Sequence, residues 1–163
     1  MVDLIVKEGT HGRGVFTRAA IAAGTRVLRY GGPFLKYRET TPQTYAVQIG
    51  PDLYLGGSGG LDDYVNHCCE PNCGLVIEGT VVDLVALRGI EAGEELLFDY
   101  STTMDEDDFE MQCHCGAPSC RKVVRDGKHL PEDVWERYAQ LGVVPGYVRE
   151  SRGRMQCVAF VKN

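Results

Sequence analysis

The sequence predicts a mainly β fold with a short helix near its C-terminus. β-Branched and aromatic residues alternate with polar ones over short stretches. Twenty glycines and seven prolines place turns between these stretches. A hydrophobic fraction of 44% with 25% charged residues is typical of a folded domain. We expect strands at residues 2–6, 14–17, 26–30, 45–49, 81–87 and 95–98.

Two of these predicted strands are preceded by similar stretches of sequence. Ile21–Tyr30 and Ile90–Tyr100 each begin with an isoleucine, turn at a glycine and end in a tyrosine. One such pair of similar segments is too few to indicate a repeat architecture. We therefore interpret the two segments as similar strand entries.

The C-terminal part contains the one persuasive helical pattern, at Pro131–Leu141. Proline suits the first helical turn, the apolar residues share one face, and Gly142 is a suitable stop. Beyond it, we expect residues 150–154 to form an exposed loop. Residues 155–161 are apolar enough to return as a strand or a docked tail.

Charge and cysteine content narrow the function. A net charge of −6 argues against a dedicated DNA- or RNA-binding surface and favours a basic partner such as a lysine-rich peptide. The first residues carry no long apolar run, so we expect neither a signal peptide nor a membrane helix. An intracellular, reducing location follows, where clustered cysteines are more often metal ligands or catalytic groups than disulfides.

The cysteines cluster in two places. Cys113, Cys115 and Cys120 lie within eight residues, and Cys68, Cys69 and Cys73 follow an Asn-His pair. Four thiolates complete a tetrahedral structural zinc site. Either Cys69 or Cys73 can supply the fourth ligand, and in both cases the metal would tie the C-terminal part to the Asn-His loop.

Five motifs in a fixed order identify a family. Residues 5–122 resemble the SET-domain protein lysine methyltransferases that carry a cysteine-rich post-SET tail. The last three motifs are specific in combination, whereas a lone Gly-x-Gly has little value. In chain order, the motifs are Gly12-Arg13-Gly14, Tyr30-Gly31-Gly32, Tyr64 to Cys73, Gly93 to Tyr100, and Cys113-x-Cys115-x4-Cys120.

The resemblance implies a β-clip fold of several small sheets with a threaded C-terminal segment. It implies a SET domain over 1–104, a post-SET zinc segment over 105–125, and a C-terminal helix and tail over 126–163. The implied reaction moves methyl groups from S-adenosylmethionine to a lysine amine, which requires alignment rather than a protein nucleophile.

The resemblance also implies the residues that hold the methyl donor. The Asn66 amide can both donate and accept hydrogen bonds, and glycines allow the backbone to approach a ligand. The expected donor-binding residues are His11, Gly12, Arg13, Gly14, Tyr30, Asn66, His67, Tyr100 and His114.

Three aromatic residues are expected to carry catalysis. Tyr100 should place its hydroxyl near the reacting groups, and Tyr45 should form another wall of the lysine channel, although core packing is an equal alternative for Tyr45. Aromatic walls suit an alkyl chain that ends in a cation. Phe98 lies where the family controls the number of methyl groups, and phenylalanine there implies di- or trimethylation.

The family motif favours Cys69 over Cys73 as the partner of Cys113, Cys115 and Cys120 around a structural zinc ion. There are departures: Asp63-Tyr64 stands in place of Arg-Phe, and Cys68 replaces a serine. The aspartate removes a positive charge that is common in the family.

The expected partner is a lysine-containing basic protein, including a histone tail. We expect no direct nucleic-acid binding and no membrane, and the C-terminal tail could serve dimerisation. The acidic run at 105–110 either attracts a basic peptide or is a solvated loop, and the solvated loop is the commoner case. A eukaryotic protein of this kind would act in the nucleus or on chromosomes, and a bacterial one in the cytoplasm. The alternative function is a catalytically silent, zinc-stabilised peptide-binding module.

Overall fold

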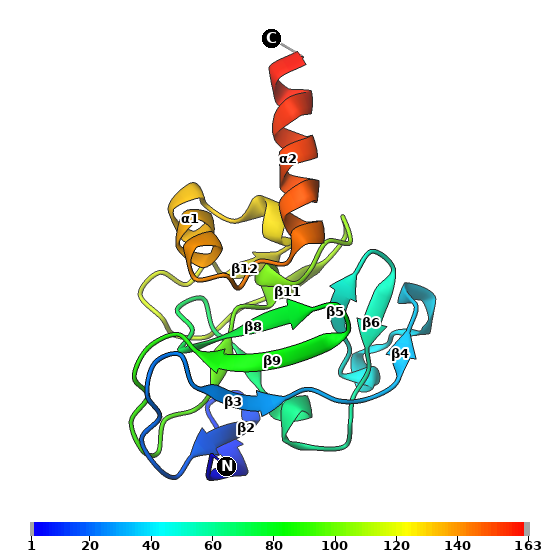
Figure 1. Ribbon diagram of the computed structural model, residues 1–163. Helices are drawn as coiled ribbons and strands as arrows, with labels where there is room; N and C mark the ends of the chain where they lie inside the picture. Colours follow the sequence, from blue (N-terminus) through cyan, green and yellow to red (C-terminus); the bar gives the residue numbers. More distant parts are fainter. Residues whose placement is uncertain (1, 162–163) are drawn as a thin grey trace.

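A computed structural model describes residues 2–161, with side chains at all of these positions except 42 and 156–161. Five small sheets form the body, and two helices follow them (Figure 1). The fold is mainly β, as the sequence predicts. The strands are β1 (Leu4–Gly9), β2 (Gly12–Thr17), β3 (Arg26–Arg29), β4 (Phe34–Leu35), β5 (Val47–Gly50), β6 (Leu53–Leu55), β7 (Asn66–His67), β8 (Cys73–Glu78), β9 (Val81–Ala86), β10 (Leu97–Phe98), β11 (Glu110–Gln112) and β12 (Val123–Arg125).

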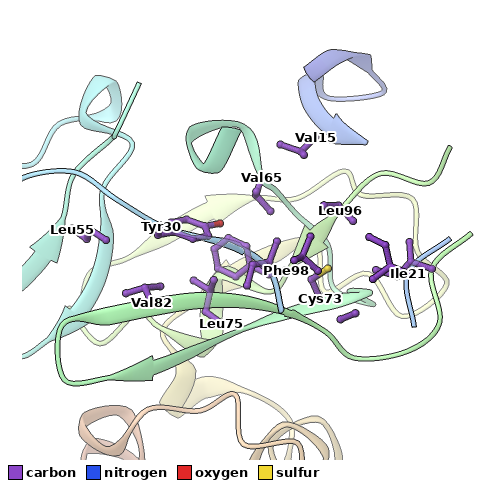
Figure 2. Packing of buried hydrophobic residues seen from close by; sticks show 14 of the residues in the cluster. Val15, Ile21, Tyr30, Leu55, Val65, Cys73, Leu75, Val82, Leu96 and Phe98 are labelled. Atoms are coloured by element: carbon purple, nitrogen blue, oxygen red, sulfur yellow. The ribbon is translucent and has the colours of Figure 1, made fainter. Parts of the chain in front are cut away.

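The main core lies against the sheet in which β9 pairs with β3 on one side and β8 on the other. Leu75 of β8, Val82 of β9 and Phe98 of β10 gather there (Figure 2). Burial of such side chains contributes about 1.5–3 kcal/mol each. Phe98 is therefore anchored by the core next to the residues expected to be functional.

A short parallel pair brings the Asn-His motif to the Phe-Asp-Tyr segment of this chain. Asn66 pairs with Leu97 and His67 with Phe98, between β7 and β10. The Cys68 amide donates to the Phe98 carbonyl at 3.1 Å, which extends the pairing. Segments about thirty residues apart in the chain thus lie side by side at the site.

The strand predictions are confirmed in the main and wrong in detail. Strands β4, β6, β7, β8, β11 and β12 were not expected. The strand predicted over 45–49 begins at Val47, because Tyr45 adopts a left-handed conformation with φ of 48°. The similar entries meet at their first residues, where Ile21 and Ile90 form an antiparallel bridge.

The C-terminal part contains two helices, α1 (Glu132–Gln140) and α2 (Gly146–Val161). The predicted helix is confirmed as α1. The loop expected at 150–154 and the strand or docked tail expected at 155–161 are wrong, because both stretches belong to α2.

Arg152 explains the first of these errors. Its guanidinium lies over the Trp135 ring at 4.5 Å, donates to the Leu130 carbonyl at 2.8 Å, and pairs with Glu132. These contacts bury a charged residue that looks exposed in the sequence. The outer part of α2 projects away from the sheets (Figure 1). Within the described residues, neither helix has the length and apolar character needed to cross a membrane.

Candidate active site and metal centre

Four cysteines form a compact thiol cluster: Cys69, Cys113, Cys115 and Cys120. Their sulfur atoms all lie within 4.8 Å of one another. The Cys69 and Cys113 sulfurs are 3.8 Å apart, and those of Cys113 and Cys120 are 3.7 Å apart. Tetrahedral zinc with Zn–S bonds of about 2.3 Å requires sulfur separations of about 3.8 Å. The cluster therefore fits the predicted ion, with no ligand position left for a substrate.

The remaining cysteines of the Asn-His motif do not join this cluster. Cys73 is fully buried in the main core, where burial raises the pKa of its thiol to about 12. Cys68 accepts a hydrogen bond from the Glu70 amide at 3.4 Å. This is a turn contact that a serine hydroxyl also makes. The open choice between Cys69 and Cys73 is thus settled in favour of Cys69.

A cavity of about 240 Å³ lies directly beside the thiol cluster. Five predicted donor-binding residues line it, together with Met111, Gln112, Cys113 and Cys115. This volume is below the range of about 300–1,000 Å³ that is typical for small-molecule sites, so part of a nucleoside ligand would lie outside it. The five predicted residues are His11, Asn66, His67, Tyr100 and His114.

The Gly-x-Gly segment contacts Asn66, which lines this cavity. The Asn66 amide donates to the Arg13 carbonyl at 3.1 Å and to the Glu95 carboxylate at 2.8 Å. A Cβ on Gly14 would lie 2.1 Å from a Glu95 oxygen and 3.0 Å from the Asn66 nitrogen. A side chain at position 14 would therefore displace the Glu95 carboxylate that accepts from Asn66. Gly12, Arg13 and Gly14 are not among the residues that line the cavity.

Tyr100 is held at both ends. Its hydroxyl donates to the Val65 carbonyl at 3.0 Å, and its backbone N–H donates to Nδ1 of His67 at 3.1 Å. Burial raises the pKa of Tyr100 to about 12, so the hydroxyl keeps its proton at neutral pH. Burial lowers the pKa of His67 to about 4, which leaves a neutral imidazole that can accept this bond.

A second cavity, of about 470 Å³, adjoins the first. The three predicted catalytic residues Tyr45, Phe98 and Tyr100 all line it, and so does Tyr30, which we expected at the donor. The rings of Phe98 and Tyr100 are 4.8 Å apart. Sequence reasoning missed several lining residues. They are Thr41, Ala46, Val47, Asp62, Asp63, Val65, Thr103, Met104, Phe109, Glu110 and Met111.

Tyr100 and Met111 line both cavities. Met111 belongs to β11, two residues before Cys113 of the thiol cluster. A short β strand with no alternating pattern gave no signal for this role. The thiol cluster thus stands directly beside the wall that the two cavities share.

Tyr45 forms an open side of the second cavity. Its side chain is 56% exposed, and its ring lies 6.3 Å from that of Tyr64. The alternative of core packing is therefore wrong for this residue. A left-handed backbone is strained for an aromatic residue. The left-handed backbone at Tyr45 thus accompanies an exposed ring in the wall of the second cavity.

The unusual Asp63 has a local explanation. Its carboxylate accepts hydrogen bonds from the amides of Ser58 and Gly59, at 2.9 and 2.8 Å. It therefore stabilises the glycine-rich loop beside the second cavity, a task that an arginine cannot perform. Of the acidic run, Asp105 and Asp107 pair with Lys128 and Glu110 pairs with Arg125, so these two cations balance part of its charge within the chain.

The chain is similar to histone-lysine methyltransferases. It is 30% identical over 140 residues to the "Histone-lysine N-methyltransferase trithorax" of Drosophila melanogaster, covering 74% of this chain and 4% of that protein. It is 31% identical over 136 residues to an H3 lysine-4 specific enzyme of Mycosarcoma maydis, covering 72% and 9%. The chain thus spans only a small part of the length of these relatives.

Solved structures give the same result for the fold. A crystal structure of KRYPTONITE with mCHH DNA, an H3(1-15) peptide and SAH matches 77% of this chain and 30% of its own, with a TM-score of 0.60 and 25% identity. A complex of KRYPTONITE with mCHG DNA and SAH matches 76% and 29%, with a TM-score of 0.62 and 26% identity. The sequence model of the SET domain matches residues 12–101, more than half of the chain. This chain belongs to the SET-domain family.

Proposed function

We propose that this protein is an S-adenosylmethionine-dependent protein-lysine N-methyltransferase. The observation that carries the proposal is the position of Tyr100, which lines a cavity with the Asn-His motif on one side and an aromatic cavity on the other. A donor in the first cavity and a lysine in the second would meet at this residue. A catalytically silent module has no need of such a shared wall.

The donor supplies an electrophilic methyl group on a positively charged sulfur. The lysine nitrogen forms the new bond to carbon with its lone pair, and the carbon–sulfur bond breaks with its electrons going to sulfur. The protein aligns the partners, which accounts for much of the rate in such reactions. Asn66 is held by Arg13 and Glu95 to meet the polar end of the donor.

The lysine amine has to be neutral in order to attack. Its ordinary pKa is about 10.4. The second cavity surrounds it with Tyr30, Phe98 and Tyr100, whose rings exclude water and disfavour the ammonium form. The adjacent sulfonium charge acts in the same direction. The buried hydroxyl of Tyr30 has no hydrogen-bond partner among the described residues, which leaves it available to the incoming amine or to water.

We propose a histone or another basic protein as the substrate. Support comes from the relatives, which are named histone-lysine methyltransferases, and from the neighbour crystallised with an H3 peptide. Asp62 and Asp63 line the second cavity and suit a basic peptide. An action on chromatin would follow from this substrate.

Replacing Phe98 by tyrosine should shift the products towards monomethyl-lysine. Phe98 packs against both Tyr30, at 6.5 Å between ring centroids, and Tyr100. A hydroxyl added between these rings would hold a water molecule and reduce the space in which a methylated amine can turn. Mass spectrometry of the peptide products measures the change. An unchanged distribution of mono-, di- and trimethyl-lysine would contradict this role of Phe98.

The proposed function is tested with a labelled methyl donor, purified histones and a cell extract. We expect wild-type protein to label a protein band, and Asn66→Ala to lose donor binding by calorimetry together with labelling. Gln140→Ala, which removes an exposed amide from α1, is the matched control and should label normally. Donor binding by the wild type without label transfer to any protein would favour the silent module.

A further inference from the structure

The C-terminal helices reach the segment that carries Tyr100. Residues 99–104 lie between the end of β10 and the acidic run, and Tyr138 and Tyr147 of the helices touch them with their hydroxyl groups. Both tyrosines lie outside residues 12–101, which match the SET domain. Both belong to a hydrophobic cluster separate from the main core.

Asp99 is the first contact point. Its side chain is fully buried, and a buried carboxylate is costly unless all its oxygens have partners. One oxygen accepts from the Ser101 amide at 3.1 Å and from the Arg121 guanidinium at 2.7 Å. The other accepts from the Tyr138 hydroxyl at 3.0 Å. Asp99 directly precedes Tyr100, so these partners also fix the backbone position of Tyr100.

Arg121 connects the same carboxylate to the thiol cluster. Its backbone N–H lies 3.5 Å from the Cys69 sulfur, while its guanidinium also lies 3.2 Å from the Ser101 hydroxyl. The network therefore joins the zinc segment, the Tyr100 segment and α1 through one buried charge. Burial and the Asp99 carboxylate both raise the pKa of Tyr138, so its hydroxyl keeps the proton that it donates.

Thr103 is the second contact point. The Tyr147 hydroxyl lies 2.6 Å from the Thr103 carbonyl and 2.9 Å from the Gln48 carbonyl, and it shares its one proton between them. Gln48 belongs to β5, and its side-chain oxygen accepts from the Asp105 amide at 2.7 Å. Thr103 lines the second cavity, so α2 holds a wall of that cavity against the adjacent sheet.

The backbone leaves little room for this segment to move. A Cβ on Gly127 would lie 2.7 Å from the Ser101 carbonyl and 2.5 Å from Val148 of α2. The Gly127 amide donates to the Met104 carbonyl at 2.9 Å. The helices and the loop before them thus pack closely against residues 99–104.

We propose that Tyr138 and Tyr147 are positioning residues, whose hydroxyls hold residues 99–104 so that Tyr100 is aligned between the two cavities. This rests on the proposed methyl transfer for its effect on catalysis. The C-terminal helices are then a working part of the active site rather than an appendage. Neither hydroxyl lines a cavity with Tyr100, so both act through Asp99 and Thr103.

The test compares Tyr138→Phe and Tyr147→Phe with a matched control, Tyr54→Phe. All three tyrosines are buried, and each change removes one hydroxyl. The Tyr54 hydroxyl has no hydrogen-bond partner among the described residues, so its loss releases nothing. We measure amide hydrogen exchange, binding of S-adenosylhomocysteine by calorimetry, and steady-state methyl transfer to a histone peptide.

We expect faster exchange confined to residues 97–105 in the two test variants and none in the control. kcat should fall about tenfold, because small misplacements near the reacting atoms can cost up to about a hundredfold. S-Adenosylhomocysteine affinity should change less than about twofold, since a factor of two is only about 0.4 kcal/mol. The KM for the peptide should also change little.

Unchanged exchange at residues 97–105, or an increase spread evenly over the protein, would overturn the proposal, because the hydroxyls would then be merely structural. An unchanged kcat would do the same. A wild-type protein that transfers no methyl group would contradict the proposed function alone. In that case the exchange pattern would still decide whether these hydroxyls order the Tyr100 segment.

Discussion

Removal of zinc should abolish methyl transfer while the main β core stays folded. The thiol cluster joins Cys69, three residues after Asn66, to the chain that places Met111 to Cys115 in the wall of the first cavity. Without the metal these thiols have no strong mutual attraction, and the post-SET segment should loosen. We expect the rate to fall by at least about a hundredfold, as it does when reacting groups are displaced by about 1 Å.

The experiment measures zinc per chain by mass spectrometry, methyl transfer, and far-ultraviolet circular dichroism during titration with a chelator. Cys113→Ser should lose both zinc and activity. Cys68→Ser is the matched control: its thiol is buried next to Cys69 but lies outside the cluster, and it should keep zinc and activity. Transfer that survives complete loss of zinc would break the link between metal and active site.

Replacing Tyr100 by phenylalanine should lower kcat by about a hundred- to a thousandfold, the usual cost of losing one pre-organised polar group at the reacting centre. The change removes the hydroxyl that donates to the Val65 carbonyl and leaves the ring in both cavity walls. Because the ring remains, S-adenosylhomocysteine should bind with nearly unchanged affinity. Single-turnover kinetics and calorimetry separate the two effects.

Tyr54→Phe serves again as the control, since it removes a buried hydroxyl that has no hydrogen-bond partner among the described residues and lines neither cavity. Its kcat should match that of the wild type. A Tyr100→Phe protein that transfers methyl groups at the wild-type rate would show that this hydroxyl has no part in catalysis. A protein that loses only donor affinity would place Tyr100 in binding alone.

The metal ligands were predictable because thiol spacing constrains geometry strongly. Three cysteines within eight residues and a fourth beside the Asn-His pair have few other uses in a reducing compartment. The choice of Cys69 over Cys73 needed the family motif. The structure gives its physical reason: Cys73 occupies the main core with no exposed surface.

The Asn66, His67 and Tyr100 cluster was likewise accessible from the sequence, because the motifs that hold it are distinctive. The helical C-terminus was not. Ser151 and Arg152 look like loop residues, but Arg152 is buried in α2 by its contacts with Trp135, with Glu132 and with the carbonyls of Lys128 and Leu130. Such tertiary contacts override local preference and leave no periodic signal.

Tyr30 and Met111 illustrate the same limit at the site. Tyr30 was expected at the donor, but the pairing of β3 with β9 places its ring against Phe98, in the wall of the second cavity. Met111 was missed because β11 has three residues and pairs with a strand of equal length. Division of the chain at residues 104 and 125 stays a prediction.

The central claim is tested most directly by mass spectrometry of histone H3 after incubation with the zinc-loaded protein and S-adenosylmethionine. We predict mass increments of one, two and three methyl groups on lysine side chains, with dimethyl- and trimethyl-lysine accumulating over time. If incubation at saturating donor and with full zinc adds no methyl group to lysine, either in H3 or in any protein of a nuclear extract, the result would contradict the account.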